Sequence, residues 1–424
     1  MSVRANSSAS FADLVLSALP RLLMAASPLL VGSLAQAGPM QDIGISSGPQ
    51  CAGTSVNNSG HVVGACAEAD GMASGFVALA PGGAVDLGHL MGGRSCSASA
   101  VTNSGRIIGS CLNGNSLSTA VVWNSATPQV TQTLDPLPLV LLPPSPAGVR
   151  TRATAFSQSG VVAGVSVNAN NTALPVVWYP ENGTANALPE GLLGLGATNC
   201  APADVDDYAA NPARPDIVGN CPGSNGRPQA VFWSANGLLG GYTSAALPLP
   251  AGATFCAAST LNSGKILGYC DFGAQGGRTA LWPNKTTAPA LLSTNPARNS
   301  GIDLNASGGV IGQYQNSTGE SIPFYWDTAN NIRTDIPSLS GGFKINVTDI
   351  GDNGMVVGTS ELIDGSRHAI SWTPSTSTVD LGTLPGGENS GARVLSQSGC
   401  YLTGSSEVGA GHATHAFVQN LCAP

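Results

Sequence analysis

The sequence predicts an all-β protein, an eight-bladed β-propeller of four-stranded blades, and three observations carry this prediction. Only 9% of the 424 residues are charged, against about a quarter in an ordinary soluble domain, while 55 glycines and 29 prolines punctuate the chain. A unit of 44 to 55 residues recurs along the sequence. A phrase at the start of the chain repeats a phrase near its end. Short strands joined by tight turns explain the composition.

Each unit is recognised by a turn between two strands. In "VNNSGHVVGAC" (56–66), Asn and Gly tolerate the positive φ of a tight hairpin, and a Val/Ile strand ending in Gly follows. The same motif returns at the turn glycines Gly60, Gly105, Gly160, Gly264, Gly308, Gly354 and Gly399.

The gap between Gly160 and Gly264 is about twice as long as the others and holds one disguised unit. Its second strand survives as "DIVGNC" (216–221), and a longer loop containing Asp206 and Asp207 replaces its turn. This brings the number of units to eight.

The third strand of six units carries a tryptophan at one repeat position. These residues are Trp123, Trp178, Trp233, Trp282, Trp326 and Trp372, and Ala78 and Gln419 take the place in the first and last units. We expect the tryptophans to pack between blades, because a blade cannot bury both of its faces alone. A β-solenoid and a seven-bladed propeller are the structural alternatives.

The sequences near the two termini distinguish between a closed ring of sheets and an open stack of sheets. "VDLGTLPGG" (379–387) is the fourth strand of the seventh unit, but the eighth unit ends at "HAFVQNLCAP" without one. "QDIGISSG" (41–48) supplies the missing strand from the opposite end of the chain. Such a clasp closes a ring and removes two exposed sheet edges, which favours the propeller with its last blade closed by the N-terminal strand.

Residues 1–37 are expected to be an export signal, followed by a single propeller domain over residues 38–424. Arg4 and Arg21 precede the mostly apolar stretch 22–34, and Ala35-Gln36-Ala37 offers small residues for cleavage. An apolar stretch of about 13 residues is too short to span the membrane as a helix. We therefore expect a periplasmic or extracellular protein with no membrane span after cleavage.

Ten cysteines in an exported chain are expected to be oxidised, and the repeat selects their partners. Each pair should face across one antiparallel hairpin or pin the C-terminus, and loops of about 15 residues would contribute about 3 kcal/mol each. The expected disulfides are Cys51–Cys66, Cys96–Cys111, Cys200–Cys221, Cys256–Cys270 and Cys400–Cys422.

The units resemble the repeats of bacterial extracellular proteins named for a His-Ala-Phe tripeptide, the HAF repeats. The resemblance covers almost the whole expected mature chain and is most specific at 368–372 ("HAISW") and 415–417 ("HAF"). Elsewhere the histidine is replaced, by Ser74, Thr119, Leu174, Gln229, Arg278 and Ile322. The resemblance implies export and a repetitive β architecture, and the family brings no established activity.

Candidate metal ligands are few. Asp204, Asp206 and Asp207 crowd one loop, which makes Ca²⁺ the one candidate cofactor, although the D-x-D-x-D-G order is missing. His412 and His415 lie close in sequence without an acidic neighbour, and we expect a structural or exposed role for them. Asp42, Asp86, Asp335 and Asp380 share a repeat position at which Asp is expected to stabilise a turn.

Three classes of function remain. The net charge of -8 and only three lysines exclude nucleic-acid binding. Because no compact catalytic constellation is visible, we expect a non-catalytic binding or interaction scaffold whose extracellular ligand is a glycan or a protein. An extracellular polysaccharide-active enzyme with its site in the central funnel is the first alternative, and a purely structural envelope or matrix component is the second. Catalysis thus stays an open question, with the balance against it.

Overall fold

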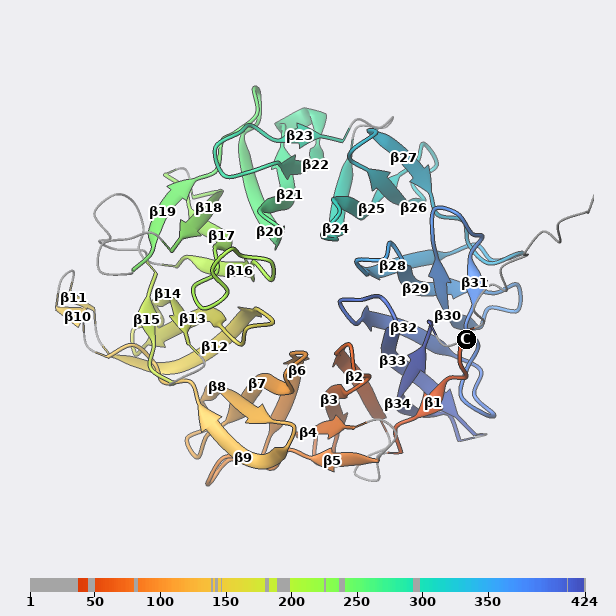
Figure 1. Ribbon diagram of the computed structural model, residues 1–424, viewed down its shortest axis with the longest axis horizontal. Coiled ribbons are helices and arrows are strands. Elements are labelled where there is room, and N and C mark those ends of the chain that lie inside the picture. The colour runs from red at the N-terminus through yellow and green to blue at the C-terminus, as the bar shows by residue number, and fades with distance from the viewer. Residues whose placement is uncertain are drawn as a thin grey trace, which may run out of the picture. The chain divides into compact units, whose positions relative to one another are not determined.

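The computed structural model of the protein describes residues 37–44, 50–79, 83–138, 140–141, 144–145, 147–179, 183–188, 199–224, 226–235, 241–292, 298–409 and 411–422. Residues 35–424 make up one compact unit, separate from residues 1–34, which fall outside this description together with nearly all of the expected export signal. The regular secondary structure of the described residues is β-strand, apart from one short 3-10 helix, η2 (Gly273–Gln275). Its sheets are arranged around a common centre as in a β-propeller (Figure 1).

Four of the sheets have four antiparallel strands each, in the order of the chain. Their first strands face the centre and their fourth strands lie at the rim (Figure 1). They comprise β6 (Cys96–Val101), β7 (Arg106–Leu112), β8 (Ser118–Asn124) and β9 (Thr127–Thr133); β12 (Gly148–Phe156), β13 (Val162–Asn168), β14 (Ala173–Trp178) and β15 (Asn186–Ala187); β24 (Asn299–Leu304), β25 (Gly309–Gln315), β26 (Ser321–Asp327) and β27 (Ile332–Asp335); and β28 (Ile345–Ile350), β29 (Val356–Glu361), β30 (Arg367–Trp372) and β31 (Val379–Asp380).

Two further sheets have eight strands, and each contains one parallel contact of a single residue pair, Gln229↔Cys256 in one and Gln50↔Thr414 in the other. The first runs through β16 (Ala201–Val205), β17 (Ile217–Pro222), β18 (Pro228–Ser234), β19 (Thr243–Ala246), β20 (Phe255–Asn262), β21 (Lys265–Asp271), β22 (Gly277–Trp282) and β23 (Ala290–Leu291). The second contains β32 (Ser390–Leu395), β33 (Tyr401–Val408), β34 (Ala413–Asn420), β1 (Gln41–Asp42), β2 (Gln50–Val56), β3 (Val62–Ala67), β4 (Ala73–Ala78) and β5 (Ala84–Asp86). A small hairpin pairs β10 (Val140–Leu141) with β11 (Pro144–Ser145).

The hairpin turns form for the reason that the sequence indicates. Gly60 has φ +78°, and its N–H donates to the Asn57 carbonyl at 2.9 Å. The Asn57 side chain accepts N–H bonds from Ser59 and His61, both at 3.0 Å. The buried Asn57 side chain therefore accepts the N–H groups of the turn that begins at Asn57.

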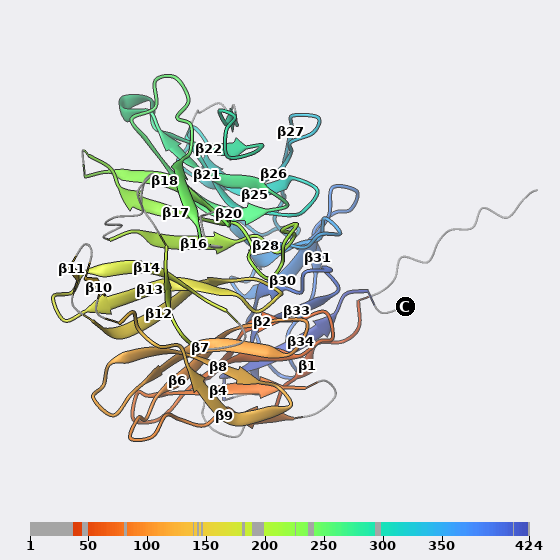
Figure 2. The ribbon, with the colours of Figure 1, turned by 60° about the vertical axis from the view of Figure 1, so that its left-hand side comes forward.

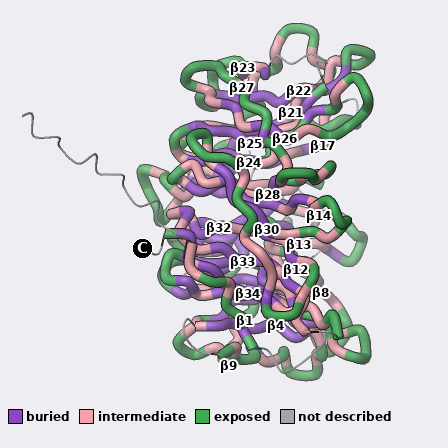
Figure 3. Tube along the Cα trace, turned by 90° about the vertical axis from the view of Figure 1, so that its right-hand side faces the viewer, coloured by how far each residue is buried: buried purple, intermediate pink, exposed green. Residues whose placement is uncertain are grey.

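The tryptophans occupy the third strands, and their packing role is confirmed. Each side chain lies between neighbouring sheets with at most 3% of its surface exposed. The indole N–H of Trp178 donates to the Asp135 carbonyl, and that of Trp282 to the Pro248 carbonyl, both at 2.8 Å. Ala78 and Gln419 are buried at the same position in β4 and β34. The middle of each sheet is buried while the turns and rims are exposed, as Figure 3 shows.

The predicted pairing of the two termini is confirmed. β1 pairs with β34 in antiparallel register, with Gln41 opposite Val418 and Asp42 opposite Phe417. The Ile43 N–H donates to the Ala416 carbonyl at 3.2 Å, which extends the pairing by one residue. Both views of the ribbon place β1 beside β34 (Figures 1 and 2). The β-solenoid alternative, in which the ends never meet, is therefore wrong.

All five predicted disulfides are present, and the described cysteines include no free thiol. Four of them join facing or near-facing residues in or directly before a first strand and in a second strand, with Cα–Cα distances of 4.0–4.1 Å. The fifth, Cys400–Cys422, ties the chain end to the start of β33. Among the described residues, no helix has the length and apolar character needed to cross a membrane.

The Gly-Gly tail of the repeat docks onto the next sheet. A Cβ added to Gly342 would lie 1.8 Å from the Glu361 carbonyl oxygen, and one added to Gly387 would lie 2.1 Å from that of Glu407. Gly93 meets Leu112 in the same way, at 2.0 Å. The second glycine of the tail is thus required by close approach of two backbones.

Candidate functional site

The strands that face the centre all carry an irregularity at the same place. A register shift, as in a β-bulge, re-aims the following side chain. At five of the eight positions that side chain is polar and lines the central cavity, namely Ser55, Asp204, Thr260, Asp303 and Asp349. The shifts lie between Gly53 and Ser55, Ala98 and Ala100, Ala153 and Ala155, Pro202 and Asp204, Ala258 and Thr260, Gly301 and Asp303, Val347 and Asp349, and Ala392 and Val394.

Three of the residues that follow a shift are aspartates, and each carboxylate bonds the backbone of the next central strand. Asp204 Oδ2 accepts the Leu261 N–H at 2.8 Å, and Asp349 Oδ2 accepts the Leu395 N–H at 2.6 Å. Asp303 Oδ2 receives the Ile350 N–H at 3.4 Å. Ser55 performs the same task with its hydroxyl for Val101, at 3.2 Å, so the position has a structural role that does not itself need a carboxylate.

Asp303 on β24 and Asp349 on β28 lie on the first strands of neighbouring sheets, and a side-chain hydrogen bond between them contributes to the pKa of each. Burial raises the pKa of both carboxyls, and the Asp303 charge raises the pKa of Asp349 further, to well above its usual range. The mutual hydrogen bond raises the pKa of Asp349 and lowers that of Asp303. Asp349 is therefore the member that holds the proton, since two like charges in contact cannot both ionise easily.

These carboxyls line a cavity of about 310 Å³ on the channel axis. Asp204 lies in the same wall, where burial holds its pKa well above the usual range against the opposing effect of its backbone hydrogen bonds. Asp207 and Asp352 add two more carboxyls, and burial raises the pKa of Asp207 to about 6. Among the described residues that line this cavity, none is basic. The lining of this cavity is thus acidic.

At the turn end of the channel, side chains of one turn accept backbone N–H bonds from the preceding turn. Most of the described turns take part in this series of hydrogen bonds. The Ser398 N–H donates to Asn58 and so links the last turn to the first. The donors and acceptors are Asn58 N to Asn103 Oδ1 (2.9 Å), Asn103 N to Gln158 Oε1 (2.7 Å), Gln158 N to Asp207 Oδ1 (2.7 Å), Ala306 N to Asp352 Oδ1 (2.9 Å) and Ser398 N to Asn58 Oδ1 (2.9 Å).

The structure does not gather the predicted Ca²⁺ ligands around one point. Asp204 bonds β20 as described, Asp206 accepts the N–H groups of Ser263 and Gly264 at 3.1 and 2.9 Å, and Asp207 accepts that of Gln158. No three acidic, histidine or cysteine side chains within the described ranges are placed to hold a metal ion. The geometry of this loop gives no support to the Ca²⁺ prediction.

The histidines have acidic partners, contrary to the expectation from sequence. His412 Nδ1 lies 3.2 Å from Glu407 Oε2, and His415 Nδ1 lies 2.8 Å from Asp42 Oδ2. Both partners are brought in by strand pairing, because Asp42 comes from the other end of the chain and Glu407 from the neighbouring strand. The histidines act as structural contacts, as expected.

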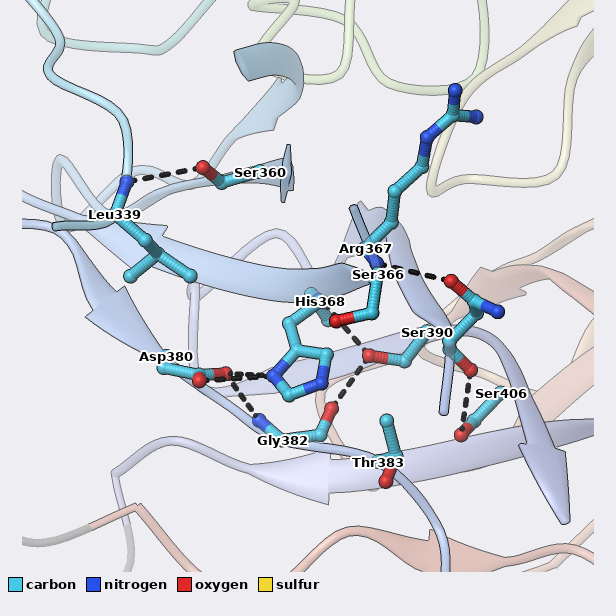
Figure 4. Close-up of polar contacts among 12 residues, drawn as sticks. Leu339, Ser360, Ser366, Arg367, His368, Asp380, Gly382, Thr383, Ser390 and Ser406 are labelled. Carbon is cyan, nitrogen blue, oxygen red and sulfur yellow. Dashed lines mark hydrogen bonds and ion pairs between the residues drawn. The ribbon is translucent and has the colours of Figure 1, made fainter. Parts of the chain in front are cut away.

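The shared Asp position does stabilise turns in three of its four copies. Gly44, Gly88 and Gly382 donate their N–H groups to Asp42, Asp86 and Asp380, respectively. Figure 4 shows Asp380 between the Gly382 N–H and the His368 ring, whose Nδ1 is 2.9 Å from the carboxylate. The fourth copy, Asp335, accepts the Tyr314 hydroxyl at 2.8 Å instead. The G-x-S-x-G match at 44–48 lies largely outside the described residues.

Sequence reasoning missed Asp303, Asp349 and Asp352. A signal was present, because "ADV", "IDL" and "TDI" place an aspartate at the same point of three aligned units, directly before the last apolar residue of the first strand. What the alignment did not reveal is the register shift that turns this position toward the channel.

No family model and no curated protein matches the chain. Similar solved structures include the β-propeller domain of the Trilobed protease from Pyrococcus furiosus, at 10% identity and TM-score 0.49, covering 82% of this chain and 98% of that one. A puromycin hydrolase (13% identity, TM-score 0.47) and a prolyl endopeptidase (14%, TM-score 0.49) match over 73% and 75% of this chain. This chain spans about half the length of each of those two, 49% in both cases.

These comparisons correct the expected function. The three structures named above belong to a protease, a puromycin hydrolase and a prolyl endopeptidase, which runs against the expected non-catalytic binding scaffold, but TolB and a lectin are among the similar structures as well. Identities of 10–14% assign no activity to this chain, and its chemistry has to be argued from its own site.

Proposed function

We propose that the protein is a hydrolase in which Asp303 and Asp349 form the acid–base pair. The pairing of these two buried carboxyls, which line one acidic cavity and shift each other's pKa, carries the proposal. Paired carboxyls that share one proton present an acid and a base side by side at the same pH. The direction of the mutual hydrogen bond assigns the base to Asp303 and the acid to Asp349.

The substrate class that suits such a pair is an amide or ester. Ionised Asp303 removes a proton from water as the water oxygen bonds to the carbonyl carbon, while Asp349 gives its proton to the carbonyl oxygen. When the tetrahedral intermediate collapses, the hydroxyl proton returns to Asp349 and Asp303 passes its proton to the leaving nitrogen or oxygen. Both carboxyls end in their starting state, so the cycle balances.

The same geometry argues against glycoside hydrolysis. Retaining and inverting glycosidases keep their carboxyls about 5 Å or more apart, to leave room for the sugar or for a water. Asp303 and Asp349 are in direct hydrogen-bond contact, which leaves no such room.

The test compares three isosteric variants of the purified protein. Asp303→Asn and Asp349→Asn keep a side-chain oxygen for the backbone clasp but remove the shared proton, whereas Asp204→Asn makes the matched change outside the pair. With fluorogenic peptide and nitrophenyl ester substrates, we expect each of the first two to lower kcat by about 10²-fold or more. Asp204→Asn should retain activity. Equal activity in all variants, or no hydrolysis by the wild-type protein, contradicts the proposal.

We infer further that the ring has eight blades. Dividing each eight-stranded sheet at its single parallel contact, Gln229↔Cys256 or Gln50↔Thr414, gives four more four-stranded units beside the four separate sheets, and β1 completes the last of them. A seven-bladed ring would leave one unit unassigned. An experimental structure of the chain tests this count.

Export and membership of the HAF-repeat proteins complete the proposal. Five disulfides favour an oxidising compartment, and the paired His368–Asp380 and His415–Asp42 give the His position of the repeat a physical role. Mass spectrometry of the protein recovered from the periplasm or medium should find Gly38 as the first residue. Recovery from the cytoplasm with residues 1–37 attached would contradict export.

A further inference from the structure

We propose that Tyr208 sets the size limit for substrates that enter the channel, so that it is a specificity-determining residue of the hydrolase proposed above. The role in substrate choice rests on that proposed function. The gate, meaning the restriction of the channel mouth by Tyr208, can be tested without it. Tyr208 belongs to the long loop between β16 and β17, the one unit whose short turn has been replaced.

The loop carries Tyr208 from one side of the ring to another. The Tyr208 hydroxyl donates to Asp352 Oδ2, a residue 144 positions later that follows β28. Asp352 is itself held by the Ala306 N–H at 2.9 Å, so the acceptor is fixed on the opposite wall. Figure 1 shows the loop between β16 and β17 lying toward the centre of the ring.

The base of the loop is anchored. The Asp206 carboxylate accepts the Tyr208 N–H at 2.9 Å and also the N–H groups of Ser263 and Gly264 in the neighbouring turn. Asp206 is buried, with 5% of its surface exposed. The aromatic ring is therefore presented by a rigid base rather than by a free loop.

Packing does not explain a tyrosine here. Tyr208 is 45% exposed, and its hydrogen bond is made across the channel mouth rather than within a core. Its neighbour Asp207 and its partner Asp352 both line the cavity that contains Asp303 and Asp349. A second bridge crosses the same end, where Asn103 Nδ2 donates to Gln397 Oε1 at 3.3 Å. Two side-chain bridges thus lie at this end of the cavity, and we expect a wide group to pass only when one of them opens.

Two consequences follow for substrate choice. An extended chain of small residues can reach the carboxyl pair past the phenol ring, whereas a bulky group requires the Tyr208–Asp352 bond to open. Opening breaks one hydrogen bond to a carboxyl group, which should lower the population of the open mouth about tenfold or more.

Access can be measured without any activity. The folded protein is treated with a water-soluble carbodiimide and either a small amine, such as glycine methyl ester, or a bulky aromatic amine, and labelling of Asp303 and Asp349 is followed by peptide mass spectrometry. Exposed Asp364 serves as the internal reference, because it lies outside the channel.

Tyr208→Ala should raise labelling of the pair by the bulky amine about tenfold relative to Asp364, and labelling by the small amine much less. Tyr208→Phe keeps the ring but loses the bridge, and should give an intermediate increase. Equal rates for wild type and Tyr208→Ala with the bulky amine overturn the gate. Faster labelling without hydrolysis of any substrate leaves the gate standing and removes the proposed activity, so the two failures are distinguishable.

Discussion

Asp42 and His415 form a side-chain pair, Oδ2 to Nδ1, at 2.8 Å although 373 residues separate them. Asp380 and His368 form the same pair at 2.9 Å across only 12 residues. In both cases the aspartate lies on a fourth strand and the histidine on the third strand of the same sheet. The seventh unit makes this contact between its own third and fourth strands. In the eighth unit the fourth strand, and with it the aspartate, comes from the other end of the chain.

Loss of this terminal pair should cost little by itself. Both side chains are partly exposed, so a double-mutant cycle with Asp42→Asn and His415→Gln should give a coupling free energy of about 0.2–1 kcal/mol in urea unfolding. The matched cycle with Asp380→Asn and His368→Gln should give a similar value.

A deletion of residues 38–44 should cost far more stability, because it removes the backbone hydrogen bonds between β1 and β34 and exposes a sheet edge. Unchanged stability of the deletion variant would show that the clasp is not needed to close the ring.

Gly342→Ala should destabilise the protein by about 1–3 kcal/mol, because the added methyl group would meet the Glu361 carbonyl oxygen 1.8 Å away. Gly411→Ala is the control, since a Cβ there meets nothing within 4 Å and the residue has no positive φ. Chemical denaturation of the two variants measures the difference. Equal midpoints would contradict a close backbone contact between the Gly-Gly tail and the next sheet.

Trp282→Phe should cost more than Trp123→Phe. The Trp282 indole N–H donates to the Pro248 carbonyl at 2.8 Å, and its loss leaves a buried acceptor unpaired, at about 1–3 kcal/mol. The Trp123 N–H is buried without a hydrogen-bond partner among the described residues, so removing it relieves an unsatisfied donor. Thermal unfolding of both variants decides, and the reverse order would show that the two indoles do not differ in this way.

The channel carboxyls should make stability fall as the pH rises. Asp207 has a pKa of about 6 in the folded protein, above the unfolded value of about 3.9, so the folded state binds its proton more tightly. Its contribution is complete below pH 4 and is lost as the pH rises through 6, by at most about 3 kcal/mol. Asp207→Asn should therefore gain stability relative to wild type over that window, measured by unfolding at several pH values.

Asp364→Asn provides a control of opposite sign. Hydrogen bonds from Ser366 lower the pKa of Asp364, so its contribution is present at neutral pH and is lost as the pH falls. If Asp207→Asn and wild type show the same pH dependence, the Asp207 carboxyl is not buried as described.

The repeat made much of the fold predictable. Each Asn-Gly turn, each tryptophan and each cysteine pair reports a local relationship, and the copies reinforce one another, so the hairpins, the disulfides and the pairing of the termini could all be predicted from the sequence. The channel could not be predicted, because it depends on a register shift in each central strand. In an ideal strand the side chains alternate between the two faces, and this alternation would fix the direction of Asp303. The register shift after Gly301 changes that direction. Likewise Tyr208 and Asp352 meet across the ring, a contact that no local pattern encodes.

The most direct test of the acidic pair is its titration. Carbon-13 NMR of protein labelled at the aspartate carboxyls, with Asp349→Asn and Asp303→Asn to assign the two signals, follows both groups from pH 3 to 9. We predict that Asp349 stays protonated well above the ordinary aspartate value of about 3.9 and that its signal shifts when Asp303 is replaced. Two independent titrations near the ordinary value would contradict the shared proton and with it the proposed chemistry.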